Sequence, residues 1–404
     1  MTHPTTNRRG VDTACAIVGG GPAGAVLALL LARKNVPVTL LESHHDFDRE
    51  FRGDSLHTST MEIMDQIGLA GRLLELPHTK LEKLTVESAA GSFTMVDLSV
   101  LKTPFPYVTL MPQARFLEFI TAEAAKFPWF DLRMGANVHD LIFDDGACRG
   151  LRYRQENADG ELRARLVVAA DGRFSRMRRL AGLDLRTTSP PIDVLWFRLP
   201  RRDRDTLSFT ARIGGGPFLA ILPRVDHFQL GYVIAKGSYH QVREEGIASF
   251  RRALAGLVPE FADRIHVLES FQSVNPLSVE IGHLEQWWMP GLLCIGDAAH
   301  VMSPVGGVGI NCAVQDAAVA ANHTARALAE DRDVPLRSLA SVQSERIFPT
   351  RVIQRFQALL QNRIMSTALD AQSSFRPPLL LRLPWLRTLP AKIFGMGLRR
   401  VRVA

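Results

Sequence analysis

The chain has 404 residues, of which 46% are hydrophobic and 22% charged, so it can bury a large core and is expected to be a soluble globular protein. Its formal net charge of +7 comes from the C-terminal end, because residues 376–404 hold seven basic residues and no acidic one, which leaves the rest formally neutral. A basic face on the folded body and a groove-reading motif are both missing, so nucleic acid is excluded as an expected partner.

Targeting and membrane-spanning signals are not expected. The first fourteen residues are polar, and the longest clean apolar run, 25–32, is too short to cross a bilayer, which predicts a cytoplasmic protein. Four cysteines lack metal-ligand spacing, so no metal site is predicted and the thiols are interpreted as reduced and structural: Cys15, Cys148, Cys294 and Cys312.

The first predicted elements are a strand over 14–18, a turn and a helix over 25–33. The turn reads GGGPAG at 19–24 and has GxGxxG spacing. Its glycines permit a tight turn, close approach of backbone N–H groups to a pyrophosphate, and close packing of helix on strand. The next strand, 38–41, ends at Glu42, whose carboxylate can accept both ribose hydroxyls of a dinucleotide. The predicted cofactor contacts are Gly19, Gly21, Pro22, Ala23, Gly24 and Glu42.

Helical and strand patterns alternate through the middle of the chain. Helices are predicted where apolar residues recur at helical spacing, over 55–69, 113–126 and 248–257. Short strands are predicted over 80–101, 132–154 and 192–235, the last stretch as an antiparallel sheet with strands at 193–199, 218–222 and 228–234. A continuous apolar run at 166–170 predicts a buried strand that ends in Asp171-Gly172.

The last predicted strand, 292–295, leads into Gly296-Asp297 and then a long Ala-rich helix over 309–328. A carboxylate at the end of a buried strand can accept hydrogen bonds from ribityl hydroxyls, and an ordinary helix cap is the alternative reading. The glycines at 306, 307 and 309 allow backbone to lie against a flat ring, towards which the following helix directs its positive end.

Together these motifs resemble those of the FAD-dependent aromatic monooxygenases, the single-component group that includes p-hydroxybenzoate hydroxylase and the ubiquinone-biosynthesis hydroxylases. Three motifs occur in the family's order: the turn at 19–24, LVVAADGRFSRMR at 166–178, and GDAAHVMSPVGGVGIN at 296–311, followed by Asp316. The resemblance implies an α/β fold. A glutathione-reductase-type FAD-binding Rossmann domain would carry an inserted antiparallel β-sheet substrate domain and a C-terminal helical, basic tail.

The resemblance also implies how the chain divides. A discontinuous FAD-binding domain would take 1–80, 105–185 and 280–365, the substrate domain 81–104 and 186–279, and a basic, apolar tail 366–404. Further cofactor contacts are implied, with Arg115 as a substitute for Gln113: Arg52, Gln113, Arg115, Asp171, Gly172, Gly296, Asp297, Pro304, Gly306, Gly307, Gly309 and Asn311.

The implied reaction uses NAD(P)H to reduce FAD, adds O₂ as a flavin 4a-hydroperoxide and transfers one oxygen atom to a hydrophobic phenol, quinone precursor or polycyclic, polyketide-like aromatic. No catalytic base is assigned, since a lone His or Tyr is more often a core or surface residue. The candidates for the catalytic site are His57, His227, Tyr232, His300 and, as a loop-shaping residue, Pro304. The substrate pocket is expected between the antiparallel sheet and the flavin, and alternation lets only one face of each strand point there. The candidate lining residues, for which a place in the core is the alternative, are Trp196, Phe197, Phe218, Ala220, Leu222, Phe228 and Tyr232.

Other functions share these FAD motifs. A reductase or dehydrogenase of a prenyl or cyclic alkene substrate is the main alternative. A flavin halogenase is a distant one, because Trp287-Trp288-Met289-Pro290 does not match the WxWxIP signature. A non-catalytic binding protein would have little reason to keep the cofactor-binding carboxylates. The tail segment 376–404 combines apolar and basic residues, which predicts peripheral contact with the inner face of a membrane or, alternatively, packing across the FAD domain.

Overall fold

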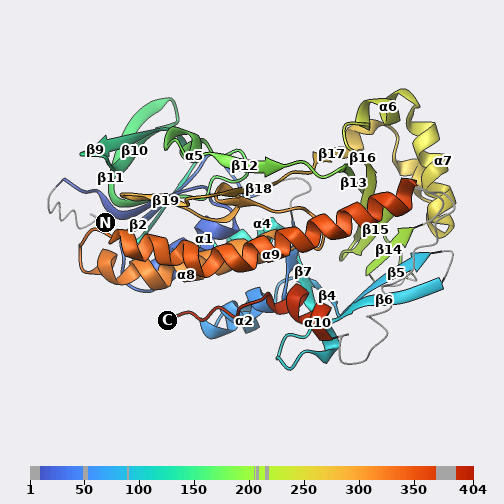
Figure 1. The fold of residues 1–404 in the computed structure, drawn as a ribbon, viewed down its shortest axis with the longest axis horizontal. Coiled ribbons are helices and arrows are strands. Elements are labelled where there is room, and N and C mark those ends of the chain that lie inside the picture. Colours follow the sequence, from blue (N-terminus) through green and yellow to red (C-terminus); the bar gives the residue numbers. More distant parts are fainter. Residues whose placement is uncertain are drawn as a thin grey trace.

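The computed structural model describes residues 10–48, 53–88, 91–203, 205, 209–213, 218–369 and 388–404. The predicted cofactor contact Arg52 and residues 370–387 of the tail lie outside these ranges. The fold is mixed α/β and elongated, and the helix α9 (Leu336–Leu369) runs along most of its length (Figure 1). Within the described residues, no helix has the length and apolar character needed to cross a membrane.

The larger of the two main sheets holds the strands that carry the motifs. Its eight strands are β1 (Thr13–Val18), β2 (Val38–Glu42), β8 (Phe130–Met134), β9 (Asn137–Asp144), β10 (Ala147–Gln155), β11 (Ala158–Ala169), β19 (Trp288–Met289) and β20 (Leu292–Cys294). In the order β20-β11-β1-β2-β8 every neighbouring pair is parallel. Strands β1 and β2 are buried along their whole length, which explains their continuous apolar sequences.

Helices pack against this sheet and against each other. They are α1 (Pro22–Ala32), α2 (Thr58–Gln66), α3 (Ala70–Leu73), α4 (Gln113–Ala124), α5 (Arg176–Leu180) and α8 (Gly309–Ala329). The hydrophobic α1 contacts both α4 and α8, so its side chains are buried almost all round. The single helix predicted over 55–69 is instead a short strand, β3 (Ser55–Leu56), followed by α2, and Gly68 with φ +74° separates α2 from α3.

The second main sheet lies toward the other end of the molecule (Figure 1). Its seven strands are β5 (Lys83–Ser88), β6 (Gly91–Asp97), β13 (Ile192–Pro200), β14 (Phe209–Ile213), β15 (Phe218–Pro223), β16 (His227–Ala235) and β17 (Asn275–Ser278), in the order β17-β13-β16-β15-β14-β5-β6. The three strands predicted within 192–235 are confirmed as β13, β15 and β16. The prediction of an entirely antiparallel sheet is wrong at one pair, because β5 joins β14 in parallel.

One face of the second sheet is covered by α6 (Tyr239–Glu244) and α7 (Ile247–Leu257). A core cluster fills this interface, and its sheet members alternate along the strands: Leu195, Phe197, Leu199, Leu219, Ile221, Phe228, Leu230 and Ile234, with Tyr232 packed against them. Because successive strand residues point to opposite faces, the residues between them lie on the other face.

Smaller sheets and the C-terminal segment complete the fold. Besides β3, the strands of the smaller sheets are β4 (Thr79–Leu81), β7 (Val108–Leu110), β12 (Leu185–Thr188), β18 (Ile281–Leu284) and β21 (His300–Val301). Residues 388–404, which begin with α10 (Thr388–Ala391) and a π-helical turn (Lys392–Met396), run beside α2 (Figure 1). This part of the tail therefore packs on the body of the protein, whereas membrane contact stays a prediction.

Candidate cofactor and active site

Four sequence signatures meet at one edge of the larger sheet. The glycine turn follows β1, Glu42 ends β2, Asp171 follows β11 and Asp297 follows β20. These four strands are neighbours and parallel, so their carboxyl ends lie at the same edge. In open α/β sheets that edge is where ligands bind.

The glycine turn after β1 is shaped by close backbone contacts. A Cβ at Gly24 would lie 2.0 Å from the Gly19 carbonyl oxygen, and one at Gly19, where φ is +103°, would lie 2.4 Å from the Ala170 carbonyl oxygen. Around Gly21, in contrast, a Cβ would meet no atom within 4 Å. No side chain caps the N-terminus of α1, so its first N–H groups face this open space and suit an anionic phosphate.

Glu42 is 8% exposed and holds the turn in place. Its Oε2 accepts a hydrogen bond from the Gly20 N–H at 2.8 Å, and its Oε1 accepts from the His44 N–H at 3.0 Å. The His44 imidazole Nδ1 also lies 2.7 Å from Oε1. The Ser43 hydroxyl donates to Oε1 at 3.3 Å as well, so these bonds orient the Glu42 carboxylate beside the turn.

Asp171 caps α5. Its carboxylate accepts hydrogen bonds from the Ser175 hydroxyl at 2.5 Å and from the N–H groups of Arg176 and Met177 at 2.7 and 3.1 Å. Arg178 on the same helix is 6% exposed and donates to the carbonyl of Ala298 at 2.9 Å, which ties this segment to the motif after β20. Asp171 therefore fixes the start of α5, and Arg178 fixes the second motif against the third.

A buried charge cluster lies behind the third motif. Asp316 on α8 is fully buried and accepts hydrogen bonds from the Gly296 N–H at 3.0 Å and from Arg346 Nε at 2.8 Å. The His300 imidazole lies 2.5 Å from the same carboxylate. Burial raises the pKa of Asp316, but His300 and Arg346 outweigh it and hold that pKa below its ordinary value. His300 is 1% exposed, so it contacts Asp316 inside the protein and stabilises the third motif through that carboxylate.

The other catalytic candidates differ in position. His57 is buried at the start of α2, and its backbone N–H donates a hydrogen bond to Asn311 Oδ1 at 2.8 Å. His227 pairs with Asp226 at 2.7 Å. Tyr232 lies edge-on to Phe250, with ring centroids 5.2 Å apart, on the sheet face that α7 covers. Only His57 among these three lies at the glycine loop before α8, where a Cβ at Gly307 would be 3.8 Å from its Nε2.

The predicted pocket residues divide between the two faces of the second sheet. Phe197, Phe228 and Tyr232 belong to the core beneath α7. Trp196 lies on the opposite face and packs against a cluster that holds Val194 and against which Val305 of the glycine loop also packs. Alternation places Phe218, Ala220 and Leu222 on the face of Trp196. The expected alternation is thus seen in the sheet, and which of the seven residues line a substrate pocket stays a prediction.

Two predicted contacts lie at the start of α4. Gln113 is its first residue and is partly exposed. Arg115 is exposed and its guanidinium lies 3.1 Å from Glu118 on the same helix, so it is engaged in a surface ion pair.

Comparison with known proteins agrees with this geometry. The family model of the FAD binding domain matches residues 12–355. The chain is 33% identical over 407 residues to 6-methylpretetramide 4-monooxygenase of Streptomyces rimosus, covering 99% of this chain and 96% of that protein. The chain belongs to the FAD-dependent aromatic monooxygenase family.

Two further matches bear on fold and function. The crystal structure of Pseudomonas aeruginosa PqsL in complex with 2-aminobenzoylacetate superposes with a TM-score of 0.76 at 21% identity, over 89% of this chain and 98% of that one. Digeranylgeranylglycerophospholipid reductase of Methanosarcina acetivorans is 25% identical over 82% of this chain and 79% of that protein. The higher identity and coverage of the monooxygenase favour the hydroxylase reading over the reductase one.

In this flavoprotein the loop before α8 is held by a row of glutamines that the sequence analysis missed. Gln357 on α9 is 2% exposed. Its Nε2 donates hydrogen bonds to the carbonyls of Ser303 and Val305 at 2.9 and 2.7 Å. Its Oε1 accepts a hydrogen bond from the Ser303 N–H at 3.3 Å. Gln361 donates to the Ser303 hydroxyl, and Gln354 donates to the carbonyls of Gly282 and Val301. The spacing 354, 357, 361 puts all three on one helix face, and that spacing was the available signal.

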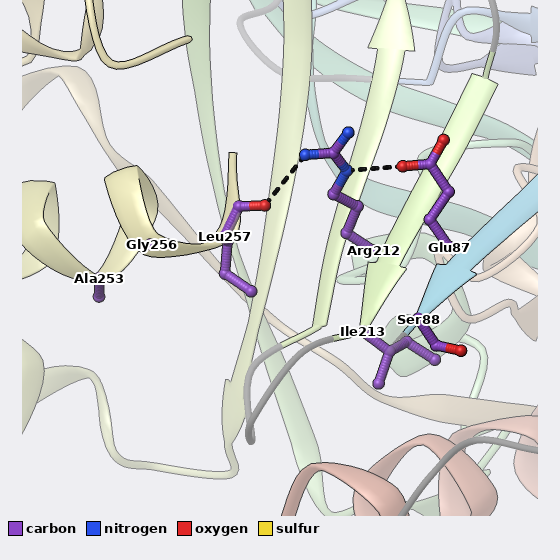
Figure 2. A pocket seen from close by; sticks show the side chains of 7 residues that line it. All are labelled: Glu87, Ser88, Arg212, Ile213, Ala253, Gly256 and Leu257. Carbon is purple, nitrogen blue, oxygen red and sulfur yellow. Dashed lines mark hydrogen bonds and ion pairs between the residues drawn. The ribbon is translucent and has the colours of Figure 1, made fainter. Parts of the chain in front are cut away.

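A separate cavity of about 430 Å³ lies at the far edge of the second sheet, between β5, β14 and α7 (Figure 2). Its only cation among the lining residues, Arg212, is 2.9 Å from Glu87 and 2.7 Å from Glu260, so its charge is already balanced. None of the predicted cofactor residues lines it.

Proposed function

We propose that this protein is an NAD(P)H-dependent FAD monooxygenase that hydroxylates a hydrophobic aromatic substrate, such as a phenol or a polycyclic, polyketide-like ring. The observation that carries the proposal is the meeting of the glycine turn, Glu42, Asp171 and Asp297 at one edge of a parallel sheet. When bound, FAD supplies the redox chemistry: two electrons from NAD(P)H and one O₂ give a ring hydroxyl and one water.

The residues of this edge fit FAD. The open space at Gly21 and the uncapped N-terminus of α1 suit its pyrophosphate, and Glu42 suits the ribose. Asp297 would accept hydrogen bonds from the ribityl chain. At Gly309 a Cβ would again meet no atom within 4 Å, and no side chain caps α8, so the positive end of this helix would stabilise negative charge on the reduced ring.

The substrate would lie between this loop and the face of the second sheet opposite α7. Trp196 of the sheet and Val305 of the loop pack against the same buried cluster, which includes Val194. Ala220 and Leu222 share the face of Trp196, so the available wall is apolar and favours a hydrophobic ring over a small charged acid. On this view the second sheet is the substrate-binding unit inserted into the FAD-binding domain.

The test is a product and oxygen balance on the purified holoenzyme. We expect NAD(P)H oxidation, O₂ consumption and hydroxylated product in a 1:1:1 ratio with a suitable polycyclic phenol, and one ¹⁸O atom in the product when ¹⁸O₂ is supplied. NADH and NADPH are compared separately. NAD(P)H oxidation that yields a reduced alkene under anaerobic conditions would instead establish a reductase.

A further inference from the structure

The C-terminal segment touches the candidate active site. Residues 388–397 pack on the body through Ala391 and Met396, which share a small core with Leu98 and Leu101. The approach is tight at Gly395, where a Cβ would lie 2.9 Å from Leu101 and 3.1 Å from Thr58 Oγ1. The segment is thus held by packing at a defined position beside α2.

Phe394 lies between the glycine loop and His57. Its ring centroid is 4.5 Å from that of His57, and a Cβ at Gly306 would lie 3.1 Å from Phe394 Cε2. The aromatic ring therefore packs on the same loop that is proposed to lie against the flavin. Residue 394 is 337 positions away from His57 in the sequence, so only the folded chain brings them together.

The backbone of Phe394 also fixes the imidazole. His57 Nδ1 lies 2.8 Å from the Phe394 carbonyl oxygen, which can only accept, so Nδ1 carries the hydrogen. Burial lowers the pKa of His57 to about 4, although the carbonyls of Phe394 and Gly306 act in the opposite direction. The ring is therefore neutral near pH 7, and no hydrogen-bond donor among the described residues faces its buried Nε2.

We propose that residues 388–397 complete the active site: Phe394 holds His57 in the Nδ1–H tautomer, so that Nε2 accepts a hydrogen bond from a hydroxyl group of the substrate. The Phe394 ring supplies an apolar wall beside that hydroxyl. This inference rests on the proposed function and assigns the orientation of the phenolic substrate to His57. The Phe394 carbonyl acts on the substrate hydroxyl only through His57, whereas the ring, which Phe394→Ala removes, acts on it directly.

The first test needs neither cofactor nor substrate. In ¹⁵N-histidine-labelled apoprotein, the ring nitrogen shifts distinguish the two neutral tautomers, and the spectrum of His57→Gln assigns the signal of His57. We expect a neutral ring with the hydrogen on Nδ1 at pH 7. A hydrogen on Nε2, or a doubly protonated ring, would overturn the proposal whatever the enzyme's activity.

The second test uses variants of the holoenzyme. His57→Leu should raise KM for a phenolic substrate by about tenfold, the effect of one lost hydrogen bond, whereas His57→Gln keeps a polar atom near Nε2 and should recover most of the loss. Phe394→Ala should lower the hydroxylated product formed per NAD(P)H oxidised. Leu398→Ala is the matched control, since Leu398 lies just after this segment and is 39% exposed.

The outcomes separate the two proposals. A wild-type enzyme that hydroxylates no aromatic compound contradicts the proposed function but leaves the tautomer measurement intact. A wild-type enzyme that hydroxylates, with KM and product yield unchanged in His57→Leu and Phe394→Ala, contradicts the role of the C-terminal segment alone.

Discussion

Gly21 and Gly24 stand three residues apart in one turn but meet different surroundings. A side chain at Gly24 would collide with the Gly19 carbonyl, whereas a side chain at Gly21 would point into open space. Gly24 is thus required by the fold of the protein, and Gly21 is required by the ligand that is expected to occupy that space. Two alanine substitutions separate these requirements.

We expect Gly24→Ala to destabilise the apoprotein by about 3 kcal/mol or more, because backbone must move to admit the methyl group. Gly21→Ala should cost less than about 1 kcal/mol, since its φ of −69° is open to any residue, but should weaken FAD binding at least about tenfold. Thermal unfolding of the apoprotein and FAD titration by flavin fluorescence measure the two effects. Equal FAD affinity in Gly21→Ala and wild type would contradict the pyrophosphate assignment.

At the scale of elements, α9 acts on the flavin loop through its glutamines. Gln357 satisfies three backbone groups of Ser303 and Val305, whereas Gln354 satisfies carbonyls outside that loop. Each backbone group left buried without a partner costs about 1–3 kcal/mol. The two glutamines therefore have similar structural value but act on different segments.

We expect Gln357→Leu and Gln354→Leu to lower the free energy of unfolding by similar amounts, about 2–4 kcal/mol. Only Gln357→Leu should also weaken FAD binding and reduce hydroxylation, because it frees the loop proposed to lie against the ring. Chemical denaturation and FAD titration of both variants make the comparison. An equal loss of FAD affinity in both would show that the effect is one of general stability.

Elements and motifs that rest on local patterns were predictable from the sequence. Strands β1 and β2 and the last four residues of β11 are apolar runs closed by Gly or an acid, and the helix α1 between β1 and β2 favours their parallel pairing. The face to which Phe228 and Tyr232 point was not predictable. The two-residue repeat of a strand predicts that neighbouring side chains point to opposite faces of the sheet. Which of the two faces α7 covers is decided by tertiary packing.

Polar contacts between residues far apart in the sequence were not predictable either. Gln357 and Arg346 are polar residues on a helix, which on its own suggests exposure, yet both are at most 2% exposed. Their partners lie on other elements: a carbonyl of Ser303 and the carboxylate of Asp316. Nothing local in the sequence pairs them, so these buried polar residues become visible only in the fold.

At the scale of the whole molecule, the last six residues bridge three helices. Gln66 on α2 binds backbone atoms of Val401 and Val403, Asn322 on α8 binds those of Arg402 and Ala404, and Lys34 after α1 donates to the Ala404 carbonyl. These bonds are at the surface, so each contributes modestly.

We expect deletion of residues 399–404 to lower the free energy of unfolding by about 1–2 kcal/mol while the protein still binds FAD. The deletion spares Phe394, so hydroxylation per NAD(P)H should stay close to that of the full chain. Denaturation midpoints and product yield test this expectation. A deletion that abolishes product formation would mean that the final residues, and not only 388–397, are needed for catalysis.

The position of β1 between β2 and β11, with β20 beyond β11, has a consequence for synthesis. The N-terminal strand leaves the ribosome first, but β20 is completed only at residue 294 and the glutamines of α9 more than fifty residues later. At a synthesis rate of roughly 5–20 residues per second, the strands and the loop that complete the cofactor edge of the sheet are made on the order of tens of seconds after the glycine turn. We expect FAD capture to be an event of the finished chain, after release from the ribosome.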